Sequence, residues 1–257
     1  MRHWSRDLRG QRVWFVGASS GIGAATARLM ADRGASVAIS GRRGALLEEV
    51  AGDRMAVVPV DVTDAAEMRR AATTVAQALG GIDTIVWCAA YWEKSDAVRW
   101  DAHSFARHYE VNVLGFNNLL ATTLPAMVEN GRGHVVGVAS VAGFRGFPGA
   151  EAYGSTKAAL IALLESLRAS LWTRGVRVTT VAPGFVKTEL TEVNDFPMPF
   201  LIDVDRAAAS IVRGIERGRL EIVFPWRMAA LMKLARYVPV RWWAARFGAT
   251  SPAKAAI

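Results

Sequence analysis

Tyr153 and Lys157 stand four residues apart in the segment Tyr-Gly-Ser-Thr-Lys, and both side chains can take part in proton transfer. If this segment is helical, residues four apart lie on one face, so the two side chains point the same way. A cation near a phenol favours the phenolate and lowers a pKa that is normally about 10. With Ser140 upstream, the pair predicts a tyrosine that acts as an acid in reduction and as a base in oxidation.

A glycine-rich turn, Gly17-Ala-Ser-Ser-Gly-Ile-Gly23, joins an apolar stretch to an alanine-rich one. Glycines permit a tight turn there and let backbone N–H groups at the start of a helix approach a pyrophosphate. The turn therefore predicts a dinucleotide site, and a structural strand-to-helix turn is the alternative.

The same turn also matches the pattern G-x-S-x-G, which presents a nucleophilic serine in hydrolases. Ser19 would then be the nucleophile, and it would need a histidine base oriented by a carboxylate. His103, His108 and His134 do not stand at obvious strand ends, so we do not favour a hydrolase.

The segment Ser40-Gly41-Arg42-Arg43 decides between two cofactors. An acid about 20 residues beyond the glycines binds the 2′-hydroxyl of NAD, whereas an arginine there pairs with the 2′-phosphate of NADP. The acid is missing, so Arg42 predicts a preference for NADP(H), with NAD(H) as the second candidate. The alternative is that both arginines are solvated loop charges.

Asp61 ends a later apolar stretch, where its carboxylate could accept a hydrogen bond from an adenine amino group. A residue at the start of a helix is the equal alternative, because aspartate favours such positions. Asp64 and Glu67, just beyond, are spaced as a capping box.

The elements that must position these residues are apolar runs of strand length that alternate with stretches of helical period. Strands that are buried on both faces read as continuous apolar runs, which favours a parallel sheet between two helix layers. We therefore expect a single-domain, doubly wound, Rossmann-like α/β fold over residues 1–225, with an irregular lid near residues 184–205. The predicted strands are Val13–Val16, Val37–Ser40, Ala56–Val60, Thr84–Ala89, His134–Ala139 and Val176–Val181.

The amino-acid composition limits which other classes of protein are possible. The 257 residues are 52% hydrophobic, enough for one large core. The uncharged run Val111–Val128 contains asparagines and Pro125, so we do not expect a membrane span. The apolar run Val13–Val16 leads into the glycine turn without a small-residue cleavage site, so we do not expect a signal peptide. A single cysteine, Cys88, excludes an internal disulfide, and four scattered histidines lack metal-ligand spacing. We expect a cytoplasmic protein without a metal.

The net charge of +8 comes from the C-terminal end, because residues 206–257 carry 10 basic and 2 acidic side chains. Residues 226–257 form a predicted basic, amphipathic helical extension, in which Pro239 starts a second helix bearing Trp242 and Trp243. One arc of the first helix holds Met228, Leu231, Met232, Ala235 and Val238. We favour packing on the chain's own domain or on a sister subunit over peripheral contact with a membrane, and we do not expect nucleic-acid binding.

These features together resemble the short-chain dehydrogenases/reductases, over about residues 10–190. The resemblance implies catalytic roles for Ser140, which would polarise a substrate carbonyl, for Tyr153 as acid or base, and for Lys157, which would also bind the nicotinamide ribose. It implies that Asn112 supports a water-linked proton relay through Lys157, and that the protein is a homodimer or homotetramer. The cofactor-binding residues that it implies are Gly17, Ser19, Ser20, Gly21, Ile22, Gly23, Arg42, Asp61, Val62, Ala89, Tyr153, Lys157, Pro183, Gly184, Val186 and Thr188.

Two segments depart from the family pattern. Val16 stands where the family has threonine, and Trp87-Cys88-Ala89-Ala90 stands where it has Asn-Asn-Ala-Gly. These positions brace the sheet and the cofactor turn, so we expect the departures to affect local stability more than chemistry. Cys88 is expected to be a small buried residue.

Five phenylalanines flank the proposed catalytic residues and predict an apolar pocket, with simple coverage of the sheet edge as the equal alternative. They are Phe144, Phe147, Phe185, Phe196 and Phe200. We therefore expect an NADP(H)-preferring oxidoreductase that moves a hydride between nicotinamide and a small apolar ketone or secondary alcohol. The alternative is a catalytically inactive, nucleotide-binding regulatory protein on the same fold, which the complete set Asn112, Ser140, Tyr153 and Lys157 disfavours.

Overall fold

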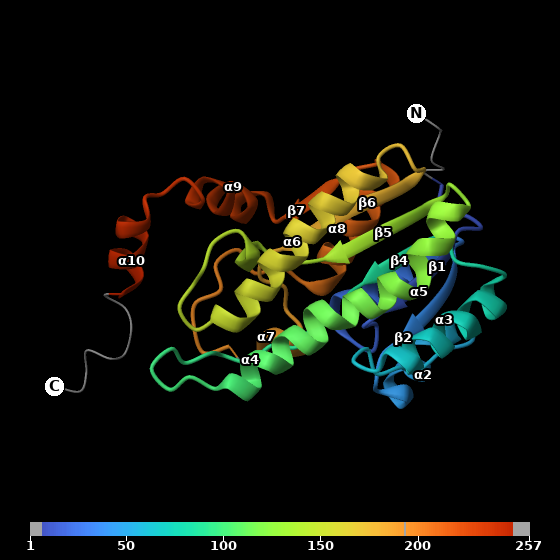
Figure 1. Cartoon of the computed structure of the whole chain (residues 1–257), viewed down its shortest axis with the longest axis horizontal. Coiled ribbons are helices and arrows are strands. Elements are labelled where there is room, and N and C mark those ends of the chain that lie inside the picture. Colours follow the sequence, from blue (N-terminus) through green and yellow to red (C-terminus); the bar gives the residue numbers. More distant parts are fainter. Residues whose placement is uncertain (1–6, 193, 249–257) are drawn as a thin grey trace.

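The computed structural model describes residues 7–192 and 194–248, and these form a seven-stranded, all-parallel sheet between two layers of helices (Figure 1). The strand order is β3-β2-β1-β4-β5-β6-β7, so the chain reverses direction across the sheet between β1 and β4. The doubly wound, single-domain fold is as predicted. The strands are β1 (Arg12–Val16), β2 (Ser36–Ser40), β3 (Ala56–Val57), β4 (Thr84–Trp87), β5 (Gly133–Val138), β6 (Val176–Pro183) and β7 (Glu221–Phe224).

The strands are mostly apolar because both faces of the sheet are covered. In β1, Val13 and Phe15 belong to one core cluster, and Trp14 and Val16 belong to the other. All four side chains are fully buried. Alternate side chains of a strand point to opposite faces, so a strand between two helix layers loses its polar face.

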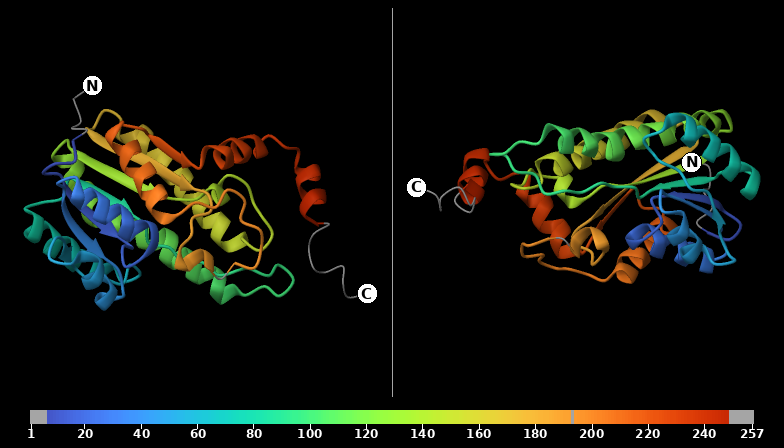
Figure 2. Two further views of the ribbon diagram at one scale, coloured as in Figure 1. Left: turned by 180° about the vertical axis from the view of Figure 1, so that it is seen from behind. Right: turned by 90° about the horizontal axis from the view of Figure 1, so that it is seen from below.

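Helices α1, α2 and α8 cover one face of the sheet, and α3, α5 and α6 cover the other (Figure 2). A π-helical turn (Glu110–Leu114) joins α4 to α5, and a 3₁₀ turn (Val141–Gly143) follows β5. The helices are α1 (Gly21–Asp32), α2 (Gly44–Ala51), α3 (Ala65–Leu79), α4 (Ala102–Tyr109), α5 (Gly115–Glu129), α6 (Glu151–Leu171), α7 (Glu189–Glu192), α8 (Val204–Glu216), α9 (Trp226–Ala235) and α10 (Val240–Gly248).

Two details differ from the sequence-based expectation. The edge strand β7 was not predicted, because it has only four residues and begins with a charged one. The capping box is half formed: the Asp64 carboxylate accepts from the backbone N–H groups of Ala66 and Glu67, but the Glu67 carboxylate accepts from Asp61 N.

The continuous helical run Ala102–Glu129 is long and apolar enough to cross a membrane by length and composition alone, and 44% of its most apolar window is buried. Its buried residues include Phe116 and Leu119, which lie in the core beneath the sheet.

Residues 226–248 contain α9 and α10, and the last residues of the predicted extension, 249–257, lie outside the described residues. Met228, Met232 and Ala235 of the predicted arc are buried, but Leu231 is 53% exposed. The prediction was wrong for Leu231 because the buried side of α9 is a narrow stripe of residues three and four apart.

Candidate active site

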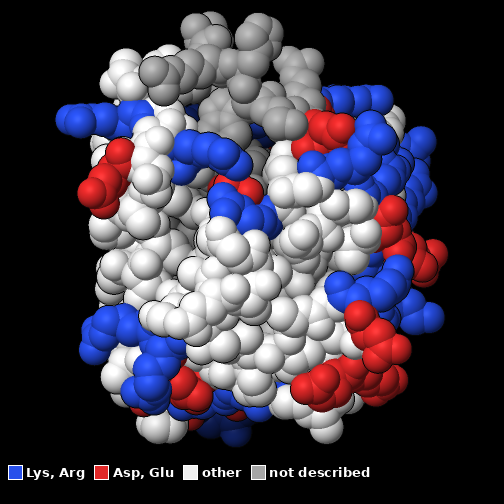
Figure 3. Space-filling model, turned by 90° about the vertical axis from the view of Figure 1, so that its right-hand side faces the viewer, with Lys and Arg blue, Asp and Glu red and all other residues white. Residues whose placement is uncertain are grey.

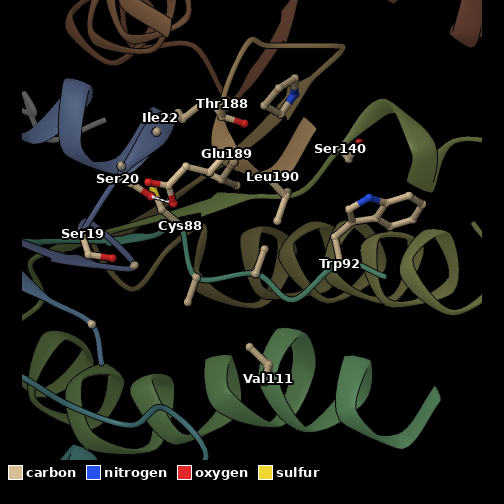
Figure 4. Close-up of a pocket in the computed structure, with 18 of the residues that line it drawn as sticks. Ser19, Ser20, Ile22, Cys88, Trp92, Val111, Ser140, Thr188, Glu189 and Leu190 are labelled. Carbon is tan, nitrogen blue, oxygen red and sulfur yellow. Dashed lines mark hydrogen bonds between the residues drawn. The ribbon is translucent and has the colours of Figure 1, made fainter. Parts of the chain in front are cut away.

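An open cleft of about 450 Å³ lies at the carboxyl ends of the strands, where the sheet reverses direction between β1 and β4. Ligands of open α/β sheets bind at this point because the loops from neighbouring strands diverge there. The cleft is lined by the glycine turn, the end of β4, Ser140, the α6 pair Tyr153 and Lys157, and the segment after β6. Figure 4 shows residues from these separate elements facing one space.

The glycine turn is shaped by two close backbone approaches. A Cβ on Gly17 would lie 2.2 Å from the backbone N of Ala89, and one on Gly23 would lie 2.2 Å from the carbonyl oxygen of Gly17. Ser20 precedes α1 without capping it through its side chain. The first N–H groups of α1 therefore face the cleft without that internal acceptor, which suits a phosphate.

Ser19 is not arranged as a nucleophile. Its Oγ accepts hydrogen bonds from Arg43 at 3.1 and 3.2 Å, and a cation in that position does not remove a proton. His108 is bonded to Ser104 O and Glu93 N, and His134 to Thr179 Oγ1. The hydrolase alternative is therefore unsupported.

Tyr153, Lys157 and Ser140 do converge. Lys157 is 2% exposed, and its Nζ donates to Val138 O at 3.0 Å and lies 5.4 Å from the centroid of the Tyr153 ring. Ser140 forms a side-chain hydrogen bond that acts on the Tyr153 phenol, and its Oγ also accepts from Ala142 N at 3.1 Å. One helical turn of α6 thus brings the phenol and the ammonium to the end of β5.

Burial acts in opposite directions on the two titrating groups. It raises the pKa of Tyr153 to about 12, against the opposing effect of the Ser140 hydrogen bond. It lowers the pKa of Lys157 to about 8, because a buried ammonium loses its hydration. The sequence-based expectation of a lowered tyrosine pKa was therefore wrong, because burial of the phenol outweighs the Ser140 hydrogen bond. The phenol is a hydrogen-bond donor at neutral pH.

Asn112 is fully buried inside the π-helical turn. Its Oδ1 accepts from Tyr91 N at 2.6 Å, and its Nδ2 donates to Tyr91 O at 3.1 Å and to Thr156 Oγ1 at 3.0 Å. Thr156 lies next to Lys157 in α6, so Asn112 connects the loop after β4 to α6. A role in a proton relay remains a prediction.

The two neighbouring arginines after β2 behave differently, although both line the cleft. Arg43 donates to Ser20 Oγ at 2.7 Å and forms an ion pair of 2.8 Å with Glu189 of α7. Arg42 is exposed and forms no hydrogen bond or ion pair with the residues that the structure describes. Arg42 is therefore the arginine whose guanidinium is available to bind an anion. Sequence reasoning missed the bonds that Arg43 forms.

Asp61 has local partners. Its Oδ1 accepts from Thr63 N at 2.9 Å and from Thr63 Oγ1 at 2.8 Å. Burial works to raise the Asp61 pKa, but these bonds and the charges of Arg42 and Arg107 outweigh it and leave the pKa lowered. Among the other predicted cofactor residues, those that line the cleft include Val62, Ala89, Pro183, Gly184, Val186 and Thr188, whereas Asp61 does not.

Trp92 is a further residue of the site that sequence reasoning missed. Its ring meets the Tyr153 ring edge-on, with centroids 5.1 Å apart, and its Nε1 donates to Asn194 Oδ1 at 3.1 Å. Lys94 forms an ion pair of 2.8 Å with Asp195 beside this bond. The loop after β4 is thus joined to the predicted lid over the tyrosine. Figure 4 shows Trp92 beside Ser140.

The described residues that line the cleft include none of the five predicted phenylalanines. Phe144 is buried in the core, and Phe147 packs on Trp243 of α10. Phe185 meets Phe196 at 6.0 Å in the segment after β6. The apolar part of the cleft lining is supplied instead by Trp92 and by aliphatic residues such as Ile22 and Leu190.

Of the residues that depart from the family pattern after β4, Trp87 lies in the core, whereas Cys88, Ala89 and Ala90 are half-buried and line the cleft. Trp87 is fully buried against Phe116, with ring centroids 5.5 Å apart. Because Cys88 is only half-buried, the expectation of a buried residue was wrong. Loss of hydration raises the pKa of its thiol to about 12, which favours the protonated form.

Comparison with known proteins agrees with this site. The model of the short chain dehydrogenase family matches residues 11–196. A relative described as an uncharacterized oxidoreductase, from Myxococcus xanthus (strain DK1622), is 43% identical over 231 residues, which cover 87% of this chain and 91% of the relative. The chain belongs to the short-chain dehydrogenase/reductase family, and it is an NAD(P)-dependent oxidoreductase.

Two similar solved structures carry different cofactors. A short chain dehydrogenase from Burkholderia cenocepacia J2315 in complex with NADP has a TM-score of 0.81 and 25% identity, covering 94% of this chain and 98% of its own. A 3-ketoacyl-(acyl-carrier-protein) reductase from Brucella melitensis complexed with NADH has a TM-score of 0.77 and 25% identity, covering 84% of this chain and 98% of its own.

Proposed function

We propose that this enzyme prefers NADP(H) and interconverts an apolar ketone and the corresponding secondary alcohol. The observation that carries the proposal is the convergence of the Tyr153 phenol, the Ser140 hydroxyl and the buried Lys157 in a cleft that opens onto the glycine turn. No observation favours the inactive regulatory alternative.

Each side chain has a role that its surroundings support. The Ser140 and Tyr153 hydroxyls donate hydrogen bonds to the substrate oxygen, and Tyr153 transfers the proton in reduction and recovers it in oxidation. The Lys157 ammonium, held by Val138 O, favours the phenolate as the proton leaves. Asn112 holds the loop and α6 in register. The nicotinamide, when bound, supplies or accepts the hydride.

The residues present fit this cofactor. The uncapped start of α1 and the Ser19 and Ser20 hydroxyls suit the pyrophosphate. The unpaired Arg42 suits a 2′-phosphate, since an arginine binds phosphate through paired, charge-assisted hydrogen bonds. Lys157 would bind the ribose, and Val186 and Thr188 would receive the carboxamide. NADP and NADH each occur in a related structure, so Arg42 is what favours NADP.

The position of Trp92 supports an apolar substrate. The edge of the Trp92 ring lies beside the reacting phenol, so a substrate carbonyl at Tyr153 must place its neighbouring groups against that ring. The polar bond to Asn194 leaves the faces of the indole for apolar contact.

A single assay tests the proposal. The purified enzyme is mixed with NADPH or NADH and a panel of ketones, and the absorbance of the reduced nicotinamide is followed. We expect a higher kcat/KM with NADPH, and with long-chain or polycyclic ketones over small polar ones. Preference for a small polar ketone would reject the substrate class, and cofactor binding without turnover on any carbonyl or alcohol would favour the regulatory alternative.

The cytoplasmic location and the homodimer or homotetramer remain predictions, the first from composition and the second from the family resemblance. The predicted lid at residues 184–205 is likewise a proposal, supported by the bonds from Asn194 and Asp195 to the loop after β4. Light scattering of the purified chain measures the number of subunits directly.

A further inference from the structure

The helices α9 and α10 extend away from the sheet as an arm, at the end of the molecule toward which the strand arrows point (Figures 1 and 2). The inner side of the arm is fixed to the loop before α6. Trp243 Nε1 donates to Gly146 O at 2.8 Å, and Arg145 donates to Val238 O at 2.9 Å. Phe147 packs against both Trp243 and Phe247. The arm is therefore held in a defined orientation, with its other side facing outward.

The outer side of the arm is apolar. Six large hydrophobic side chains there are between 53% and 85% exposed. They are Trp226, Leu231, Leu234, Tyr237, Val240 and Trp242. Other exposed apolar residues, including Trp100, Phe196 and Phe200, belong to the loop after β4 and the segment after β6, which reach the same end of the molecule (Figure 2). An apolar surface gathered in this way marks a contact with another body.

The arm is also basic. The helices α9 and α10 carry Arg227, Lys233, Arg236, Arg241 and Arg246, and the sequence has no acidic residue beyond Glu221. Glu221 itself pairs with Lys233. The opposite end of the molecule differs, because acidic and basic side chains alternate there (Figure 3). The single sign of charge is thus a local property of the arm.

The combination of exposed apolar side chains and basic side chains indicates what kind of partner the outer side of the arm binds. A second copy docked arm to arm would set like charges against each other without an acidic residue to pair with them. A bilayer with anionic headgroups offers the missing negative charge, while tryptophan and tyrosine favour its interface and arginine stems reach along it. The apolar side chains and the basic side chains of the arm then both have a partner.

We propose that the outer side of α9 and α10 docks on the surface of an anionic lipid bilayer, with the mouth of the cleft turned toward it. Met228 of α9 packs beside Gly184 at the cleft, so docking brings the substrate entrance close to the lipid. If the substrate class under "Proposed function" holds, this is where an apolar ketone dissolved in lipid would be collected. The docking itself does not depend on that class.

The test uses the full-length chain and sedimented vesicles of phosphatidylcholine, with or without about one third phosphatidylglycerol. We expect binding to the anionic vesicles, weak binding to the neutral ones, and release as added salt screens the charges. Absence of binding to anionic vesicles would overturn the proposal, as would equal binding to both lipids.

Two matched pairs of variants locate the surface. Trp242→Ala is compared with Trp172→Ala, whose indole is similarly exposed (63% against 59%) but lies at the end of α6. Arg227→Glu combined with Arg241→Glu is compared with Arg69→Glu combined with Arg217→Glu, which lie on α3 and after α8. We expect the arm variants to weaken binding at least about fivefold and tenfold respectively, since each basic residue contributes substantially near an anionic surface. The control variants should bind like the native chain.

Light scattering in the absence of lipid tests the remaining possible occupant of this surface, which is a second copy of the chain. The native chain and the arm variants should have the same mass. A lower mass in the arm variants would show that this side covers another copy of the chain, and would overturn the proposal. Circular dichroism and NADPH binding confirm that each variant is folded, independently of turnover.

Discussion

The Nζ of Lys157 lies 5.4 Å from the centroid of the Tyr153 ring and donates to Val138 O, the last residue of β5. This bond anchors the ammonium at the end of the strand, from where it faces the phenol. Burial keeps the phenol protonated, with a pKa of about 12, and brings the lysine pKa to about 8. A protonated phenol in this position can donate a hydrogen bond to an oxygen atom in the cleft.

Trp92→Ala tests the contact that covers the tyrosine. Loss of the indole should lower kcat/KM for a bulky apolar ketone about tenfold, because the aromatic wall beside the substrate is removed. Trp92→Phe retains a ring and loses only the bond to Asn194, so it should cost about threefold or less. NADPH binding should not change in either variant.

The control for this prediction is Trp100→Ala on the same loop, where the exposed indole packs on Phe105. Steady-state kinetics that find equal losses in Trp92→Ala and Trp100→Ala would indicate a general effect on the loop.

Arg42→Ala and Arg43→Ala separate cofactor choice from local structure. Arg42 is unpaired among the described residues, so its loss should reduce the ratio of kcat/KM for NADPH to that for NADH by about 10- to 100-fold. Arg43 is held by Ser20 and Glu189, so its loss should affect both cofactors similarly. A larger change in the ratio for Arg43→Ala would reverse the assignment of the 2′-phosphate site.

Asn112→Ala should destabilise the enzyme by about 2–4 kcal/mol in urea unfolding, because the backbone N–H and C=O of Tyr91 lose their bonds to Asn112 and Thr156 Oγ1 keeps only its bond to Tyr153 O. Asn118→Ala in the same helical run loses a single bond, to Val62 O, and should cost about 1 kcal/mol. Equal losses in the two variants would argue against a bracing role for Asn112.

Asp83 should make stability depend on pH. Its carboxylate is buried and bonded to Arg12 at 2.7 Å and to Arg132 at 2.6 Å. Burial works to raise the Asp83 pKa, but the bonds to the arginines outweigh it and lower the pKa. The unfolded chain therefore binds the proton first as the pH falls below about 4, and stability present above that pH is lost.

In urea unfolding between about pH 6 and pH 3, the Asp83→Asn variant should be less stable than the native chain at the higher pH. On acidification its free energy of unfolding should fall by less than that of the native chain, by about 1–2 kcal/mol. Asp53→Asn, at an exposed position, is the control. An unchanged pH dependence in Asp83→Asn would contradict the role of this ion-pair cluster.

The fold could be predicted from sequence because its signals are local. Continuous apolar runs such as Val13–Val16 mark strands that are buried on both faces, and the four-residue spacing from Tyr153 to Lys157 places both side chains on one side of α6. The edge strand β7 was not predicted because it is short and because its burial depends on packing against α8 and α9, which no local sequence pattern reveals.

The parts of the site that were missed depend on contacts between distant segments. Trp92 meets Asn194, and Arg43 meets Glu189, across more than 100 residues of chain. The direction of the Tyr153 pKa was missed for a related reason, because burial of a side chain is set by the whole fold and not by its nearest charge.

The most direct test of the account is the turnover of Tyr153→Phe. This change removes the proton donor and keeps the ring that meets Trp92, with Tyr237→Phe on the exposed arm as the control. We expect ketone reduction by NADPH to fall at least about 100-fold in Tyr153→Phe, while NADPH binding stays within about threefold of the native value. Turnover equal to that of the native enzyme would contradict the central claim that this phenol supplies the proton.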